Sequence, residues 1–488
     1  MKGGHMNNIT KLLNIEDEGI RILNISIENN TKVIEIEKIV VPHFCPNCHE
    51  RMYSKGIYKR TVNHSMLQDG FTLSIQIHQR RWVCSNPECR FTVNDEFTFV
   101  QPGKRITNLL PFLIVNALKD INKTTVMVAK QFNVSDTYVH YCFAKMVDMK
   151  RLPLPRILCV DEVHLNISDT MNYCFVMMDF ETREIVDILP NRRQKTLDEY
   201  FYGISKKERN NVEIIISDMY QSYLDFPSKY FTHSHVIVDS FHVIAYINQQ
   251  LNLYLIELER KFKARDKQAL EEKNFSLNTE YKTSKKSKEV ILLQKYKFFL
   301  LADADEITYY STTRYNRHLK QSLTTDQIEK MFFEVDDKLK IYRDYKQKYL
   351  RFNKTKFESK AVCEERLHEI INDYFELKSP IFTKIANLLK VNIEHIVNSF
   401  EWVQLHNEEL KSKNEVIARL SNGPMESFNR IPKDYKRNGR GHKNFEFVRN
   451  RLIFSNRKNA PILAIPKSDA EVHSFKGKVR GSYKSNKK

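Results

Sequence analysis

Three aspartates in the middle of the chain, Asp161, Asp218 and Asp239, each follow a short run of strongly apolar residues. Such runs predict buried strands, so each carboxylate is expected where a strand ends. Because burying a lone carboxylate is costly, an acid in that place is usually paired, hydrogen-bonded or bound to a metal ion. Three carboxylates gathered at one edge of a sheet predict a site for Mg²⁺ or Mn²⁺, which prefer oxygen ligands.

A fourth acid, Glu426, lies much farther along the chain in the motif Asn-Gly-Pro-Met-Glu-Ser-Phe-Asn, which spans residues 422–429. Asn-Gly-Pro predicts a turn with proline at the start of a helix, so Glu426 is expected in the first helical turn. The basic residues that follow predict contacts with backbone phosphates. They are Arg430, Lys433, Lys436, Arg437, Arg440 and Lys443.

Other acids near these strands are expected to lie outside the site. Strand alternation turns Glu162 to the face opposite Asp161. Asp179 and Asp187 are expected to be turn or surface acids. Only the acids at the strand ends and in the helix start are therefore candidates for the metal site.

Two cysteine pairs near the start of the chain predict a second, different metal site. Cys45 and Cys48 form a CxxC, and Cys84 and Cys89 form a CxxxxC after thirty-five residues of hairpin-like sequence. This arrangement favours a tetrahedral four-cysteine zinc ribbon, in which His43 or His49 could replace one cysteine. The remaining cysteines stand in apolar sequence and are expected in the core: Cys142, Cys159, Cys174 and Cys363.

The sequence between the cysteines and the first acid-ended strand predicts a helix-turn-helix. A short helix at 124–132, a three-residue turn and a capped second helix from Asp136 follow each other directly. The second helix of such a motif enters the DNA major groove. The residues predicted to contact DNA here are Lys130, Ser135, Thr137, Tyr138 and His140.

The order of elements from Ile157 to Asp239 is three strands, a helix, a strand, a helix and a strand, which is typical of a ribonuclease-H-like α/β domain. No glycine then occurs between Gly203 and Gly423, and apolar residues recur at helical spacing over 243–420. The α/β sequence lacks its closing helix at this point. We therefore predict that an all-helical domain is inserted into the α/β core.

Composition limits the class of protein and its partners. The chain of 488 residues has 78 Lys and Arg against 60 Asp and Glu, a formal charge of +18 that favours nucleic acid. No run of about eighteen apolar residues predicts a membrane span. Residues 1–6 resemble a cloning remnant before a native Met6. The sequence shows no export signal, so we expect the cysteines to lie in a reducing cytoplasm. The expected parts are a zinc-ribbon domain (7–100), the helix-turn-helix domain (101–152), the core (153–242), the insertion (243–420), closing helices (421–460) and a basic tail (461–488).

Taken together, these motifs resemble those of bacterial insertion-sequence transposases of the Asp-Asp-Glu type, in the ISL-three family. The resemblance covers nearly the whole chain. The stretches that carry it are Val160–Glu162, Ser217–Tyr220, Asn422–Asn429 and Arg440–Phe445, together with Arg449 and Arg451.

The resemblance implies that Asp161, Asp218 and Glu426 hold two Mg²⁺ or Mn²⁺ ions that catalyse DNA cleavage and strand transfer. Asp239-Ser240-Phe241-His242 resembles an Asp-x-x-His element whose histidine lies beside the scissile phosphate, so His242 is expected in the site. The alternative is a strand-end ion pair of Asp239 with His242. Trp402 is expected in the core, with stacking on a displaced DNA base as the alternative.

The implied partners are the terminal inverted repeats of the element and the target DNA, bound by a homodimer in the bacterial cytoplasm at the nucleoid. Two other functions remain open at this point. A nuclease of the same fold would cut DNA without joining it. A non-catalytic regulator would keep the zinc ribbon and helix-turn-helix on a transposase-derived body.

Overall fold

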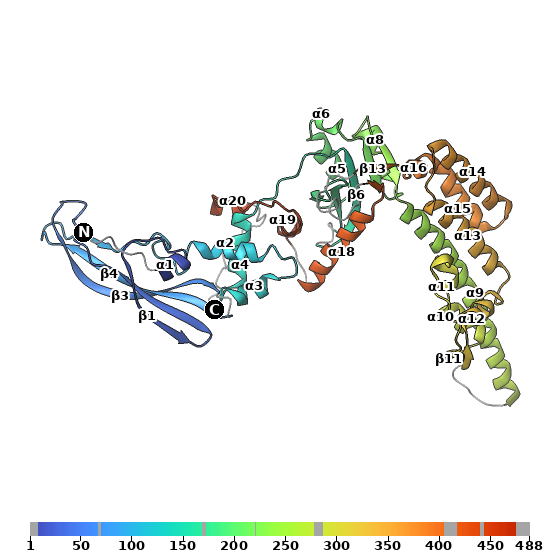
Figure 1. The fold of residues 1–488 in the computed structure, drawn as a ribbon, viewed down its shortest axis with the longest axis horizontal. Coiled ribbons are helices and arrows are strands. Elements are labelled where there is room, and N and C mark those ends of the chain that lie inside the picture. The colour runs from blue at the N-terminus through green and yellow to red at the C-terminus, as the bar shows by residue number, and fades with distance from the viewer. Residues whose placement is uncertain are drawn as a thin grey trace, which may run out of the picture.

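The computed structural model describes residues 8–66, 70–167, 172–219, 221–277, 286–404, 417–439 and 444–474. Figure 1 shows an elongated molecule with a strand-rich N-terminal part at one end and a group of helices at the other. A second sheet lies between them. Within the described ranges, no helix is both long and apolar enough to cross a membrane.

The N-terminal sheet has the strand order β1-β2-β4-β3, with β5 beside β4. Only β2 and β4 pair in parallel; the other neighbours are antiparallel. One face is closed by a small core in which Ile34 and Ile75 pack with Phe97 and Phe99. The elements are α1 (Asn8–Leu12), β1 (Ile20–Glu28), β2 (Thr31–Lys38), β3 (Met52–Met66), β4 (Thr72–Cys84) and β5 (Thr92–Asn94).

Three helices follow: α2 (Leu109–Ala117), α3 (Thr125–Gln131) and α4 (Asp136–Met146). The predicted pair of short helices is present as α3 and α4, and both have side-chain caps. The Thr124 hydroxyl accepts from the N–H of Met127, and the Ser135 hydroxyl accepts from the N–H of Tyr138. Asn133, in the turn between them, has φ of 51°, a left-handed conformation that asparagine tolerates better than most residues.

The central sheet has the order β10-β9-β6-β7-β8. Strands β6, β7 and β8 form an antiparallel meander, and β9 and β10 run parallel to β6. The strands match the runs predicted from the sequence. The elements are β6 (Ile157–His164), β7 (Tyr173–Asp179), β8 (Ile185–Leu189), α5 (Gln194–Tyr202), α6 (Lys206–Arg209), β9 (Ile214–Ser217), α7 (Gln221–Leu224), α8 (Phe226–Lys229) and β10 (His235–Val238).

The two faces of the central sheet bury different helices. Leu158 and Val160 point into a core with Phe201 of α5 and Phe226 of α8. Alternate residues such as Cys159 point into the opposite core, which contains residues of α2, α3 and α4 and of two C-terminal helices, α18 (Gly423–Asn438) and α19 (Phe445–Asn456). The helix-turn-helix pair and the sheet therefore share one hydrophobic core. A last short helix, α20 (Asp469–Ser474), lies beside α4.

A mostly helical region separates β10 from α18 and has its own core. Its first helix, α9, has 38 residues and so spans about 57 Å. The helices are α9 (Ser240–Leu277), α10 (Lys288–Lys295), α11 (Phe298–Leu301), α12 (Thr325–Phe333), α13 (Lys338–Lys354), α14 (Lys360–Glu376), α15 (Pro380–Val391) and α16 (Ile393–Asn398), with one 3-10 turn at Ala304–Glu306.

The prediction that this region is all helical is wrong. It contains one short hairpin, β11 (Arg314–Asn316) with β12 (Gln321–Leu323), and a second, β13 (Trp402–Gln404) with β14 (Ile417–Arg419). Helical spacing does not reveal strands of three residues, because they are too short to show an alternating pattern. Trp402 is 46% exposed on β13, so the expectation of a core tryptophan is also wrong.

The second hairpin fastens the helical region to the sheet. The Arg419 guanidinium donates to the carbonyl oxygens of Ser399 and Asn353, and its Cζ lies 3.8 Å from the ring centroid of Phe400. The strand edge is covered as well, since His395 Nδ1 of α16 lies 3.1 Å from the carbonyl oxygen of Val236 in β10. Polar contacts therefore tie α13 and α16 to the segment that leads into α18.

Asp187 is not the turn or surface acid that the sequence suggested. Its side chain is buried on β8, where it accepts from Arg449 Nε at 2.8 Å and from the Tyr200 hydroxyl at 2.9 Å. Arg449 comes from α19, far away in the sequence. The chain can therefore bury this acid because a distant arginine neutralises it, and nothing local to β8 indicates that.

We predict that Asp187→Asn lowers the free energy of unfolding by about 3–5 kcal/mol, because it leaves the Arg449 charge buried without a counter-charge. Chemical denaturation measures the change. Asp373→Asn is the control, since Asp373 pairs with Lys348 on the surface, and such pairs are worth less than about 1 kcal/mol. Equal losses in the two variants would contradict a structural role for the buried pair.

Candidate active site at the edge of the central sheet

Strand register brings the three predicted aspartates to one level of the sheet. Cys159 of β6 is paired with Ile216 of β9, and Asp161 and Asp218 each come two residues later. Asp239 directly follows Val238, the last residue of β10 in register with β9. Because paired residues of parallel strands point to the same face, all three carboxylates lie at the same edge and on the same side.

The same side of the sheet is covered by α18. Cys159, Ile216 and Ile237 share a core with Met425 and Phe428 of this helix. The helix begins as the sequence predicted, with Asn422 before it, proline in its first turn and Glu426 in that turn. Packing of α18 on the sheet thus carries Glu426 to the edge that holds the aspartates.

Asn429 is a site residue that the sequence reasoning quoted in a motif but gave no role. It lies one helical turn after Glu426, is 5% exposed, and its Nδ2 donates to Asp161 Oδ2 at 2.7 Å. The available signal was its spacing of three residues from Glu426, which places both side chains on one face of a helix. Asn429 therefore fixes the orientation of the Asp161 carboxylate.

Glu162 points to the other face, as strand alternation predicted. Its carboxylate accepts from the Tyr223 hydroxyl at 2.6 Å and forms an ion pair with Arg192. Tyr223 belongs to the core on the face away from α18. Glu162 is therefore separated from the group of acids that faces Glu426.

Asp239, His242 and Glu426 form one close group in the described part of the chain, with one ligand atom from each lying within 4.8 Å of the others. Asp161 and Asp218 are not members of that group. They are neighbours of it, because the charges of Asp218 and His242 both act on the pKa of Asp161. His242 is thus close enough to both sets of acids for its charge to act on the pKa of Asp161 and of Glu426.

Two acids of the site, Asp161 and Glu426, are held in an environment that resists their ionisation. Burial raises the pKa of Asp161 to about 6, and the charge of Asp218 adds to this, while the N–H of Glu162 and the charge of His242 oppose it. Burial and the charge of Asp239 also raise the pKa of Glu426, against the opposing effect of His242. Such an oxygen-rich, like-charged donor set fits a hard divalent cation.

The basic residues predicted to follow Glu426 differ in exposure. Arg430, Lys433 and Arg437 are exposed and Lys436 is half-buried. The charges of Arg430 and Lys433 lower the pKa of Glu426, against the effect of burial, whereas Arg437 forms an ion pair with Asp434. Arg440 and Lys443 lie outside the described residues. The exposed side chains of Arg430 and Lys433 thus follow the acidic edge along α18.

The predicted contacts of the helix-turn-helix also differ in exposure. Lys130, Ser135 and Thr137 are exposed, while Tyr138 and His140 are half-buried. The His140 ring lies 4.4 Å from the ring of Phe447 in α19, and burial lowers its pKa. The first three residues are therefore open to a ligand from solvent, and His140 also serves the packing of α4 on α19.

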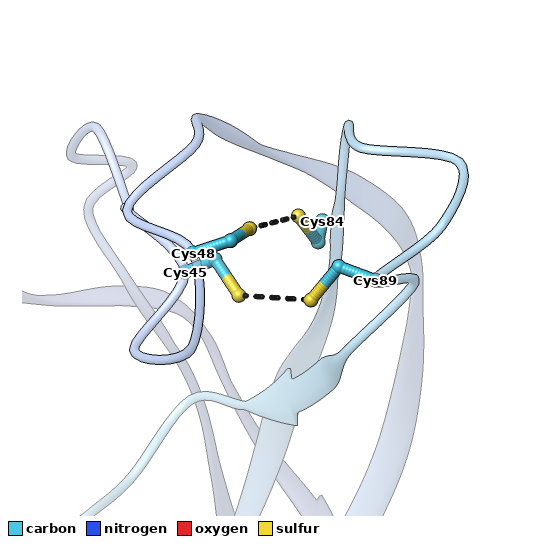
Figure 2. Close-up of side chains that lie close together, drawn as sticks. All are labelled: Cys45, Cys48, Cys84 and Cys89. Carbon is cyan, nitrogen blue, oxygen red and sulfur yellow. Dashed lines mark hydrogen bonds between the residues drawn. The ribbon is translucent and has the colours of Figure 1, made fainter.

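The four paired cysteines come together at one end of the N-terminal sheet, as Figure 2 shows. Cys45 Sγ lies 3.6 Å from Cys89 Sγ, and Cys48 Sγ lies 3.3 Å from Cys84 Sγ. The two candidate histidines are not part of this group; His43 instead stacks on Trp82 with ring centroids 4.3 Å apart. Four sulfur atoms at such separations fit a tetrahedral zinc ion.

The central sheet has an acidic edge, a helix with basic residues after Glu426, and a pair of short capped helices packed into the same core. In a comparison of the chain with protein families, the transposase family model DDE_Tnp_ISL3 matches residues 158–452. The chain therefore belongs to the ISL3 (ISL-three) family of DDE transposases. No similar sequence was found among curated proteins.

We predict that Asp161→Asn stabilises the protein by about 3 kcal/mol at pH 7 in buffer without Mg²⁺ or Mn²⁺, because it removes a carboxylate whose pKa is raised to about 6. The folded state binds the proton more tightly than the unfolded chain, so the wild type loses stability as the pH rises from about 4 to about 6. The advantage of the variant should accordingly vanish near pH 4. Chemical denaturation at both pH values measures it, and a gain that is independent of pH would contradict the role of ionisation.

Proposed function

We propose that this protein is a DNA transposase that binds the terminal inverted repeats of an insertion sequence and catalyses metal-dependent strand cleavage and strand transfer. Membership of the ISL3 family supports transposition in general. The observation that supports the finer proposal is that strand register puts Asp161 and Asp218 on one side of the sheet, the side on which α18, with Glu426, packs. These acids come from two adjacent strands and a facing helix that are far apart in the sequence.

The proposal includes a ribonuclease-H-like core divided by an inserted helical region. The antiparallel meander β6-β7-β8, extended by two parallel strands, supports this fold. Helices α18 and α19 return to the same sheet after the helical region and close its core. The boundaries predicted from the sequence, with an insertion over 243–420, remain part of the proposal.

Asp161, Asp218 and Glu426 would hold two Mg²⁺ or Mn²⁺ ions. When bound, such ions activate the attacking oxygen and stabilise the leaving 3′ oxygen of a phosphodiester. The residues of the chain supply the framework for this chemistry. Asn429 holds the Asp161 carboxylate in one orientation, and packing of α18 on the sheet excludes water from beneath the acids. His242, in the first turn of α9, would contact the scissile phosphate.

The surrounding modules would position the DNA. Arg430 and Lys433 can neutralise backbone phosphates next to the site. The exposed residues of α3 and α4 would contact the terminal repeats, and their shared core with the sheet would fix the distance from repeat to scissile bond. The four-cysteine group would hold a structural Zn²⁺. A homodimer, predicted by resemblance, would bring the two element ends together.

The test is a cleavage and strand-transfer assay on DNA that carries the element end, with Mg²⁺ or Mn²⁺. We expect Glu426→Gln to reduce both reactions by at least about 10³-fold while DNA binding is retained, because a catalytic carboxylate is lost without a change of shape. Glu446→Gln is the matched control, because Glu446 also lies in the first turn of a helix but is exposed.

The outcomes separate the candidate functions. Full activity of Glu426→Gln would contradict the proposed triad. A wild type that cuts DNA but never joins a 3′-OH to a target would indicate a nuclease. A wild type that binds one DNA sequence tightly and does neither would indicate a regulator.

Zinc binding at the cysteine group gives a second test. We expect Cys84→Ser to lose about one zinc per chain, with local unfolding around β3–β5, because structural zinc supplies folding free energy. Native mass spectrometry counts the zinc, and proteolysis reports the unfolding. Cys363→Ser is the control, since Cys363 is buried in α14 away from the group. Wild-type zinc content in Cys84→Ser would contradict the assignment.

A further inference from the structure

The group of Asp239, His242 and Glu426 contains an imidazole, which the metal site inferred from the sequence does not use. Its three ligand atoms lie within 4.8 Å of one another. The three residues come from the end of β10, the first turn of α9 and the first turn of α18. A divalent ion with bonds of about 2.1 Å in an octahedral site has ligand atoms about 3 to 4.2 Å apart. Small side-chain rotations therefore suffice to close this group around one ion.

The backbone of His242 is held in place at the start of α9. The backbone N–H of His242 donates to the carbonyl oxygen of Asp239 at 3.0 Å. The next residue, Val243, is fully buried in the core of the helical region. His242 Nε2 is buried without a hydrogen-bond partner among the residues that the structure describes. A buried nitrogen of this kind is costly unless a ligand occupies it.

Asp239 also has the properties of a ligand. It is 2% exposed, and its Oδ1 accepts from the N–H of Phe241 at 3.2 Å at the start of α9. That bond fixes the Asp239 carboxylate next to Glu426. The charge of Asp239 raises the pKa of Glu426, so the two carboxylates repel each other. Two like-charged carboxylates in one buried place are stabilised most directly by a cation between them.

We propose that Asp239, His242 and Glu426 form a divalent-cation site, distinct from the Asp161 and Asp218 pair, that prefers Mn²⁺, Co²⁺ or Zn²⁺ to Mg²⁺. Imidazole suits these transition metals, whereas Mg²⁺ favours carboxylate and water oxygens. This inference deepens the proposed function, on which it rests through the shared residue Glu426. The chain would then have one all-oxygen position at Asp161 and Asp218 and one mixed position at His242.

The experiment is a titration with Mn²⁺ alone of the full-length protein, which carries one Zn²⁺ per chain at the four-cysteine group. Electron paramagnetic resonance measures free Mn²⁺ without any DNA. We expect the wild type to bind about two Mn²⁺ per chain. His242→Ala and Asp239→Asn should each weaken one of them by about 10-fold or more and leave the other. Asp161→Asn should weaken the other ion, and excess Mg²⁺ should displace only the ion at Asp161.

His368→Gln is the matched control, because His368 lies 3.9 Å from Glu364 on the surface of α14 and belongs to no group of three candidate ligands in the described part of the chain. Circular dichroism and thermal unfolding establish whether each variant is folded. If His242→Ala or Asp239→Asn is not folded, His242→Gln is measured in its place. Wild-type Mn²⁺ binding in both His242→Ala and Asp239→Asn would overturn the site. Because binding is measured without DNA, loss of this site and loss of transposase activity are scored separately.

Discussion

The energetic cost of holding several carboxylates together in a partly buried place is the constraint on which the rest of this structure depends. Asp161, Asp218 and Asp239 sit at one level of the central sheet because of strand register, and α18 adds Glu426 on the same side. Burial raises the pKa of Asp161 and of Glu426. A site of this kind lowers the stability of the fold until a cation binds, so the surrounding packing has to supply that stability.

The segments that supply this packing are far apart in the sequence. Two helices begin at the acidic edge: α9 follows Asp239 directly, and α18 carries Glu426 in its first turn. Because α9 continues for 38 residues into the helical region, His242 is rigidly connected to that region. Arg419 fastens the same region to the segment before α18. A partner that displaces the helical region would therefore move His242 and Glu426 together.

The predicted DNA-reading helices are equally tied to the site. Helices α2, α3 and α4 pack into the core under the sheet, with α19 between them and β8. Buried arginines reinforce this arrangement, since Arg451 donates to the carbonyl oxygens of Asp120 and Lys123 and Arg449 pairs with Asp187. Each of these arginines joins α19 to a segment that is far from it in the sequence. The result is a fixed separation between a candidate DNA contact and a candidate site of chemistry.

The sequence by itself determined the local features: the acid-ended strands, the paired cysteines, the capped helices α3 and α4, and Glu426 in a helical first turn. Each of these depends on residues that are neighbours in the chain. Tertiary structure alone decided that Glu426 groups with Asp239 and His242, that Asn429 holds Asp161, that Asp187 is buried against Arg449, and that Trp402 lies on an exposed hairpin. Those outcomes depend on strand register and on packing between distant segments, which no local pattern specifies.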